Sequence, residues 1–216
     1  MKYTTAIFDL DGTITDSAPG ILNSIRYALE KKGIRQPSEE VLRSFIGPPL
    51  KEQFQCVFGL TAKEGEEMVS LYRQYYGDKG IFENRVYDGV MEMLENLKRS
   101  GIRILMATSK PEKYAIRIAE HFGFGRYFEF IGGACMDGTR TAKHEVIEYV
   151  LKACSIPENE RDNTVMIGDR RHDILGAKKS GIHSIGVLYG YGSKEELTAA
   201  GAEETAALPS DITGLF

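Results

Sequence analysis

Short apolar runs that alternate with amphipathic helical patterns constrain the fold of this chain more than any other feature. Each run is a few residues long and rich in β-branched side chains, which is typical of strands buried on both faces of a sheet. Glycines such as Gly101 and Gly181 follow the ends of the intervening helical patterns, as is common at helix C-termini. The alternation predicts an α/β fold, a doubly wound parallel sheet with helices on both faces. The runs span residues 4–8, 102–107, about 128–131, 164–167 and 183–188.

The helical patterns between these runs have recognisable start signals. Asp88 is the predicted N-cap of the helix that ends before Gly101, and Pro111 opens the next one. A third helix is expected to begin near Thr141, and a fourth to span residues 173–179.

Residues 19–84 break the alternation, because they contain helical patterns and no convincing strand. Apolar residues recur at i, i+3 and i+4 over residues 19–32, 38–45, 50–58 and 61–76, and the last segment begins with a capping box from Thr61 to Glu64. A chain of 216 residues suits one domain with an insertion. We therefore expect a core domain of residues 1–17 and 85–216, with a small helical domain of residues 18–84 inserted after the first strand.

Charge and hydropathy exclude several classes of protein. The net charge of −4 argues against a protein that holds a nucleic acid polymer through its phosphates, although a small cationic pocket stays possible. No stretch approaches the roughly 18 apolar residues of a membrane span, and the first apolar run stops at an acid too early for a signal peptide. We expect a cytoplasmic protein without a membrane segment, and no obligate protein partner is evident.

The three cysteines do not indicate a disulfide framework or a zinc site. Cys56, Cys135 and Cys154 are odd in number, widely spaced and free of any CxxC pair. Buried or idle thiols are the expected state.

Polar residues follow three of the predicted strands and open one of the predicted helices. Because ligands bind at the carboxyl ends of strands in open α/β sheets, we expect these residues to meet at one edge. They are Asp9 and Asp11 after the first strand, Thr108, Ser109 and Lys110 after the second, Gly168 and Asp169 after the fourth, and Lys143 at the start of the helix before that strand.

The acids Asp9 and Asp11 are the most informative pair. Two carboxylates so close together raise each other's pKa unless a cation lies between them, and Mg²⁺ prefers such oxygen ligands. Gly12 and Thr13 permit a tight turn that brings backbone N–H groups toward an anion. An ordinary Asp-Gly turn with a capping acid is the alternative.

The other polar residues each have a simpler explanation when taken alone. The hydroxyl of Thr108 would suit a phosphate oxygen, but threonine is also common at a helix entry. Lys143 could be a solvated lysine, and Asp169 a capping residue. Their combination, in this order on successive strand ends, favours a phosphate-handling site.

These residues resemble the four motifs of the haloacid dehalogenase superfamily: Asp-Leu-Asp-Gly-Thr at 9–13, then Thr108, Lys143, and Gly-Asp-x-x-x-Asp at 168–173. The resemblance implies that Asp9 is a nucleophile that forms an aspartyl-phosphate and that Asp11 is a general acid and then a general base. It also implies phosphate binding by Thr108 and Lys143. Mg²⁺ would be bound by Asp9, the main-chain carbonyl of Asp11, and Asp169, with Asp173 orienting them, and Ser109 and Gly12 are further phosphate-binding candidates.

Within the superfamily, Asp11 implies a phosphorus substrate, since the haloalkanoate dehalogenases lack an aspartate at that position. The helical insert resembles the small cap of the phosphoglycolate phosphatase and nucleotidase branch, where 45–50 would be a substrate-facing loop or a helix-breaking linker. Residues 137–143 and 189–192 resemble bacterial 5′-nucleotidases.

We therefore expect Mg²⁺-dependent hydrolysis of a phosphate monoester on a small phosphorylated metabolite. A sugar-phosphate mutase with the same motifs is one alternative, and a non-catalytic phospholigand-binding module is another.

Overall fold

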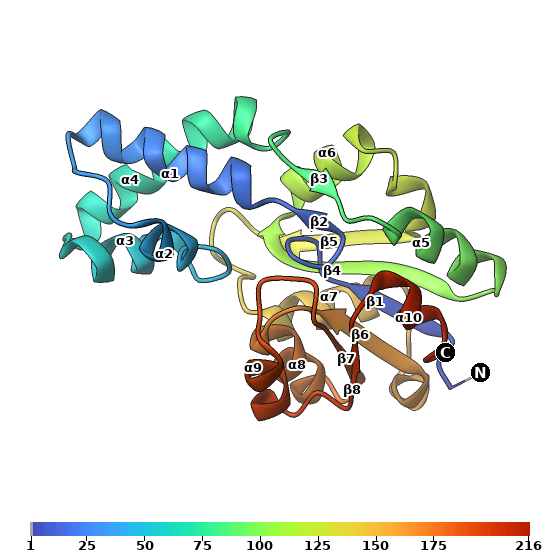
Figure 1. Ribbon diagram of the computed structural model, residues 1–216. Coiled ribbons are helices and arrows are strands. Elements are labelled where there is room, and N and C mark those ends of the chain that lie inside the picture. Colours follow the sequence, from blue (N-terminus) through green and yellow to red (C-terminus); the bar gives the residue numbers. More distant parts are fainter. Residues whose placement is uncertain (1) are drawn as a thin grey trace. The chain divides into compact units, whose positions relative to one another are not determined.

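The computed structural model describes residues 2–216, and its larger part contains a six-stranded sheet (Figure 1). All neighbouring strands of this sheet are parallel. β1 is a central strand, with Ile7 opposite Leu105 on one side and Met166 on the other. The predicted doubly wound parallel-sheet fold is confirmed. In spatial order the strands are β5 (Phe130–Ala134), β4 (Arg103–Pro111), β1 (Thr5–Phe8), β6 (Thr164–Gly168), β7 (His183–Val187) and β8 (Glu204–Ala206).

Helices cover both faces of this sheet (Figure 1). One face carries α7 (Lys143–Ala153), α8 (Arg171–Lys179) and α9 (Lys194–Ala200), and the other carries α5 (Val90–Arg99), α6 (Glu112–His121) and α10 (Pro209–Thr213). This two-sided cover explains why the residues of β1 and β6 are buried throughout and why those strands read as continuous apolar runs.

Close packing between α7 and the sheet fixes the position of the first residue of that helix, Lys143. Val146 and Val150 of α7 are fully buried in a core cluster with Ile7 and Leu105. Gly132 of β5 makes room for this contact, because a Cβ atom at that position would lie 2.4 Å from Val150 Cγ2. The helix start is therefore held against the carboxyl ends of the central strands.

The chain divides into two compact units, Met1–Asp16 with Val86–Phe216 and Ser17–Arg85. The second unit is helical: α1 (Ala18–Lys32), α2 (Glu39–Arg43), α3 (Leu50–Phe58), α4 (Ala62–Tyr75) and a π-helical turn over Tyr76–Gly80. The predicted capping box is present, since Thr61 Oγ1 accepts from Glu64 N and Glu64 Oε2 accepts from Thr61 N. The division into two independent domains, residues 1–17 with 85–216 and residues 18–84, stays a prediction.

Several short elements differ from the sequence-based expectation. α5 has Gly89 as its N-cap rather than Asp88, because the left-handed conformation that starts the helix (φ 84°) favours glycine. Strand β8 was not predicted, since its three residues are mostly exposed at the edge of the sheet. β2 (Thr15–Asp16) and β3 (Arg85–Val86) form a separate two-stranded sheet.

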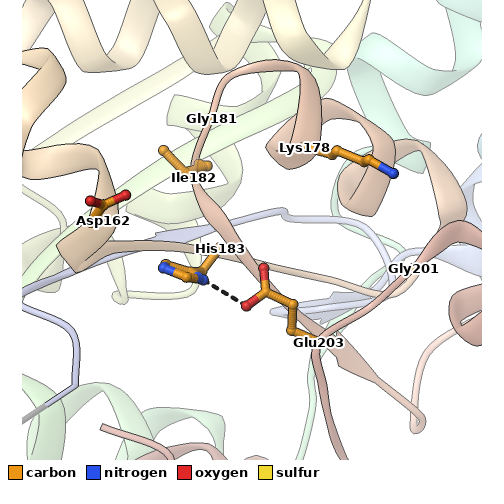
Figure 2. A pocket seen from close by; sticks show the side chains of 7 residues that line it. All are labelled: Asp162, Lys178, Gly181, Ile182, His183, Gly201 and Glu203. Carbon is orange, nitrogen blue, oxygen red and sulfur yellow. Dashed lines mark hydrogen bonds and ion pairs between the residues drawn. The ribbon is translucent and has the colours of Figure 1, made fainter.

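A shallow hollow of about 320 Å³ lies at the amino ends of β6 and β7, opposite the edge where the predicted site residues gather (Figure 2). In it His183 Nδ1 lies 2.6 Å from Glu203 Oε2, and Asp162 lies on the other side. The hollow contains none of the predicted site residues.

Among residues 2–216, no helix combines the length and the apolar character that a membrane crossing requires. The three cysteines are free thiols, with Cys56 exposed and Cys135 and Cys154 half-buried.

Candidate active site

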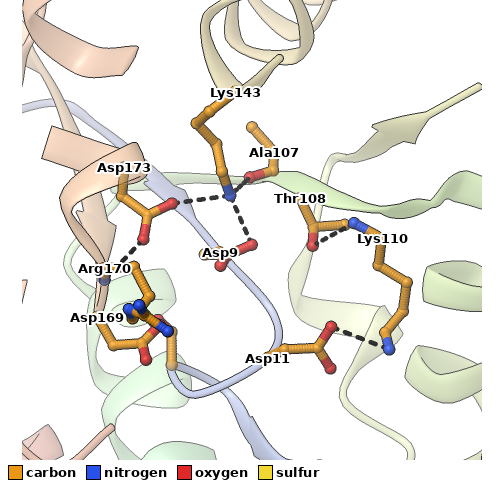
Figure 3. A network of polar contacts seen from close by, with 10 residues as sticks. Asp9, Asp11, Ala107, Thr108, Lys110, Lys143, Asp169, Arg170 and Asp173 are labelled. Atoms are coloured by element: carbon orange, nitrogen blue, oxygen red, sulfur yellow. Dashed lines mark hydrogen bonds and ion pairs between the residues drawn. The ribbon is translucent and has the colours of Figure 1, made fainter. Parts of the chain in front are cut away.

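The predicted site residues meet at the carboxyl ends of the central strands (Figure 3). Asp9 directly follows β1 and donates its backbone N–H to Ile167 O of β6 (2.9 Å). Asp169 directly follows β6, and Asp173 lies in the first turn of α8. Adjacent parallel strands thus place the two acids that follow them side by side.

Lys143 joins two of these acids. Its Nζ lies 2.8 Å from Asp9 Oδ1 and 2.8 Å from Asp173 Oδ1, and it donates to the Ala107 carbonyl (3.1 Å). Burial alone would lower the pKa of this lysine, but the carboxylates of Asp173 and Asp9 raise it above its ordinary value. Lys143 is therefore a buried, permanently charged cation at the centre of the site.

Three buried carboxylates lie close together beside this ammonium group, which pairs with two of them. Asp9, Asp169 and Asp173 each offer an oxygen, and these oxygens lie within 4.8 Å of one another. Burial raises the pKa of Asp169 well above its ordinary value and that of Asp173 to about 6, and neighbouring carboxylates add to both shifts. Such crowding of negative charge is stabilised by a divalent cation, and an all-oxygen donor set suits Mg²⁺. The residues present therefore fit a magnesium ion.

Asp169 is held by groups that are remote in sequence. Its Oδ2 accepts from Tyr191 N (2.8 Å) and its Oδ1 from Thr13 Oγ1 (3.4 Å). A Cβ atom on Gly12 would lie 2.2 Å from Asp169 Oδ2, and one on Gly190 would lie 2.3 Å from Asp169 Cβ. Both glycines are thus required for the close approach of the backbone to this carboxylate.

The turn after Asp11 uses its own backbone groups. Gly12, in the left-handed conformation (φ 85°), donates its N–H to Thr15 O (2.8 Å), and Thr15 N donates to Leu10 O (3.0 Å). The Gly12 amide is therefore engaged within the turn, and its predicted contact with phosphate stays a prediction.

β4 continues to Pro111 and therefore includes Thr108, Ser109 and Lys110. Its register against β5 shifts between Thr108 and Pro111. Thr108 is therefore not at the start of α6, contrary to the expected helix entry. Alternation along the strand buries the side chains of Thr108 and Lys110 and exposes Ser109. Thr108 Oγ1 accepts from Lys110 N (3.2 Å).

Two features of the site were not assigned from the sequence. Lys110 was expected at this edge but was assigned no role, and its Nζ lies 2.9 Å from Asp11 Oδ2. Residues 189–192 resemble a segment of bacterial 5′-nucleotidases, but the hydrogen bond from Tyr191 N to Asp169 was not predicted. The two-residue spacing from Thr108 to Lys110 could have indicated the first feature, since it places both side chains on one face of a strand.

A model of the haloacid dehalogenase-like hydrolase family matches residues 6–187. The chain is 44% identical over 199 residues to a 5′-nucleotidase from Pseudomonas aeruginosa, covering 92% of this chain and 89% of that one. It is 29% identical over 212 residues to a phosphoglycolate phosphatase from Pseudomonas fluorescens, covering 95% of this chain and 75% of that one. It is also 42% identical over 186 residues to tyrosine-protein kinase PtkA from Mycobacterium tuberculosis, covering 86% of this chain and 62% of that one.

The crystal structure of "a predicted phosphatase" from Clostridium acetobutylicum superposes with a TM-score of 0.92 at 40% identity and covers 100% of this chain and 98% of that one. The chain belongs to the haloacid dehalogenase-like hydrolases. The predicted resemblance is confirmed, and so is the enzyme class that it implied, a phosphoric monoester hydrolase.

Proposed function

We propose that this chain hydrolyses the phosphate monoester of a small metabolite through an aspartyl-phosphate on Asp9, with Mg²⁺ as cofactor. The ion pair between Asp9 and Lys143, 2.8 Å apart at the end of β1, is the observation that carries the proposal. Repulsion between a carboxylate and a phosphate anion must be offset before the carboxylate can attack, and a buried ammonium beside Asp9 does this.

In the first step an Asp9 oxygen attacks phosphorus, the bond between phosphorus and the leaving oxygen breaks, and Asp11 gives its proton to that oxygen. In the second step Asp11 takes a proton from water, which attacks the same phosphorus, so that inorganic phosphate leaves and Asp9 is restored. A covalent intermediate of this kind divides one difficult displacement into two easier ones. Thr108 and Lys143 are the proposed ligands of the phosphoryl oxygens, with Ser109 as a further candidate.

Mg²⁺ would be held by Asp9, Asp169 and the main-chain carbonyl of Asp11, and Asp173 would orient these groups through Lys143. The three buried carboxylates support this donor set. When bound, the ion would neutralise part of the charge on the phosphoryl group.

Turnover of 4-nitrophenyl phosphate tests the reaction. The purified chain should release nitrophenol when Mg²⁺ is added and should stop when EDTA is added, and Asp9→Asn should be inactive. Asp162→Asn, at the opposite end of the sheet, is the matched control and should keep full activity. A wild-type chain without turnover, or an Asp9→Asn variant as active as the wild type, would overturn the proposal.

The substrate class is proposed from the relatives named 5′-nucleotidase and phosphoglycolate phosphatase. A panel of nucleoside 5′-monophosphates, 2-phosphoglycolate and hexose phosphates, with released phosphate as the readout, distinguishes these classes. A mutase would instead convert a hexose phosphate to its isomer in the presence of a sugar bisphosphate. A non-catalytic module would bind one of these compounds and release no phosphate.

The similarity to PtkA supplies a competing activity, transfer of phosphate to tyrosine. Incubation with labelled ATP separates the two, because a kinase would leave an alkali-stable label on tyrosine, whereas a phosphatase would label Asp9 only transiently and release free phosphate. We expect the chain to act on small phosphorylated metabolites in the cytoplasm.

A further inference from the structure

A second buried lysine faces the other aspartate of the Asp9-Leu10-Asp11 segment. Lys110 Nζ lies 2.9 Å from Asp11 Oδ2, and only 5% of the Lys110 side chain and 21% of the Asp11 side chain are exposed. Figure 3 shows the pair to one side of the cluster around Lys143. A buried ammonium is unfavourable unless it has a partner, so this ion pair is a specific feature and not a chance surface contact.

The backbone of β4 fixes the lysine that makes this contact. Lys110 N donates to Thr108 Oγ1 (3.2 Å), inside the short segment where the register of β4 shifts. The strand alternation points the side chains of Thr108 and Lys110 to the same side. The ammonium group is therefore delivered to Asp11 from a rigid element.

The two oxygens of Asp11 have different surroundings. Oδ2 is paired with Lys110, whereas Oδ1 is buried and has no hydrogen-bond partner among the described residues. Rotation of the carboxylate would exchange the two oxygens, and the ion pair opposes that rotation. One oxygen is thus held while the other stays available for a proton.

We propose that Lys110 is a positioning residue for Asp11. The ammonium group of Lys110 holds Oδ2 of Asp11, so that Oδ1 of Asp11 faces the leaving-group oxygen. The inference rests on the proposed function, in which Asp11 is the general acid. It divides the work between two lysines, because Lys143 contacts Asp9 and Asp173 whereas Lys110 contacts Asp11.

The loss of rate that a defect in proton transfer causes depends on the pKa of the leaving group. An alkoxide or phenolate of high pKa needs a proton as it departs, and a positioned general acid contributes about 10²- to 10⁴-fold to such steps. A nitrophenolate leaves readily without one. Loss of Lys110 should therefore slow ethyl phosphate and phenyl phosphate much more than 4-nitrophenyl phosphate.

The experiment compares kcat and KM for these three esters in the wild type, Lys110→Met, Lys110→Arg and the control Lys113→Met, an exposed lysine at the start of α6. In kcat/KM, which reports only the transfer of the phosphoryl group to Asp9, Lys110→Met should lose about 10-fold or more on ethyl phosphate and less than about 3-fold on 4-nitrophenyl phosphate. Lys110→Arg should recover part of the loss, and the control should match the wild type.

A double-mutant cycle with Asp11→Asn gives a second test that tolerates some loss of stability. If Lys110 acts through Asp11, adding Lys110→Met to Asp11→Asn should cause no further loss in kcat/KM on ethyl phosphate. Equal losses in kcat/KM on all three esters, or additive losses in the cycle, would overturn the positioning role while the wild type remained active. A wild type that hydrolysed none of the esters would instead overturn the proposed function itself, and with it this role.

Discussion

Lys143 Nζ lies 2.8 Å from Asp9 Oδ1, so the proposed nucleophile and its counter-charge are joined in a largely buried ion pair. The same nitrogen reaches Asp173, which makes Lys143 the link between the end of β1 and the first turn of α8. This ion pair, the acid cluster, the glycines that surround it and a partly exposed ion pair elsewhere in the sheet domain each lead to a testable prediction.

The first concerns Lys143 itself. In the absence of Mg²⁺, Lys143→Met would leave the buried carboxylates of Asp9 and Asp173 without a cation, and breaking a buried pair typically costs about 3 to 5 kcal/mol. We expect a loss of that order in the free energy of unfolding in urea, together with loss of turnover. Lys152→Met, an exposed lysine on the same helix, should change neither. A Lys143→Met variant as stable as the wild type would show that this pair does not support the fold.

The second concerns the metal. Mg²⁺ should raise the melting temperature of the wild type. A Mg²⁺ concentration of about 100 times Kd stabilises the folded state by about 2.7 kcal/mol. Asp169→Asn removes one charge from the cluster and should abolish most of that shift, whereas Asp162→Asn should keep it. The check is a thermal melt with Mg²⁺ and with EDTA, and an unchanged shift in Asp169→Asn would remove this residue from the donor set.

The third concerns the space around Asp169. A methyl group on Gly190 would lie 2.3 Å from Asp169 Cβ and also 2.3 Å from Gly12 O, so Gly190→Ala should displace the carboxylate. We expect weaker Mg²⁺ binding in calorimetry, by about 10-fold or more, since groups that orient metal ligands typically contribute 10- to 100-fold. Gly214→Ala is the control, because the nearest atom to a Cβ there is 3.5 Å away. Equal affinity in both variants would contradict the argument.

The fourth concerns pH. Arg103 donates to both carboxylate oxygens of Glu129, at 2.9 and 2.6 Å, and holds the pKa of Glu129 below its ordinary value of 4.5. A lowered carboxyl pKa stabilises the folded state above the ordinary pKa, and this contribution is lost as the pH falls through the folded-state value. Since the pair is partly exposed, the contribution should be less than about 1 kcal/mol.

Urea unfolding at about pH 6 and about pH 3 measures this contribution. Glu129→Gln should lose less stability between the two conditions than the wild type does. Glu95→Gln is the control, because Glu95 pairs with Arg99 at 2.9 Å on the exposed face of α5, and it should leave the pH dependence as it is. Parallel losses in Glu129→Gln and the wild type would contradict the prediction.

The sequence was sufficient for the parallel sheet and for the edge where the polar residues meet. Apolar strands such as residues 4–8 are recognisable because both of their faces are buried, and the acids that end them stand out by contrast. In a parallel sheet the carboxyl ends share one edge, so Asp9 and Asp169 could be predicted to lie at the same edge. That they lie side by side depends on the pairing of β1 with β6.

The pairing of individual side chains could not be predicted in the same way. The contact of Lys110 with Asp11 depends on the register of β4 against β1 and on the shift between Thr108 and Pro111. The hydrogen bond from Tyr191 N to Asp169 depends on the path of a loop after β7. Neither the register nor the loop path follows from local composition.

The two glycines that surround Asp169 limit how the site could be redesigned. Gly12 and Gly190 leave so little room that a single methyl group on either would overlap the carboxylate. Asp169→Glu would keep the charge but add a methylene in the same confined volume. The position of the Asp169 carboxylate is therefore restricted by the size of this enclosure as well as by its hydrogen bonds, and any change of the residue at 169 has to alter the loop at 189–192 as well.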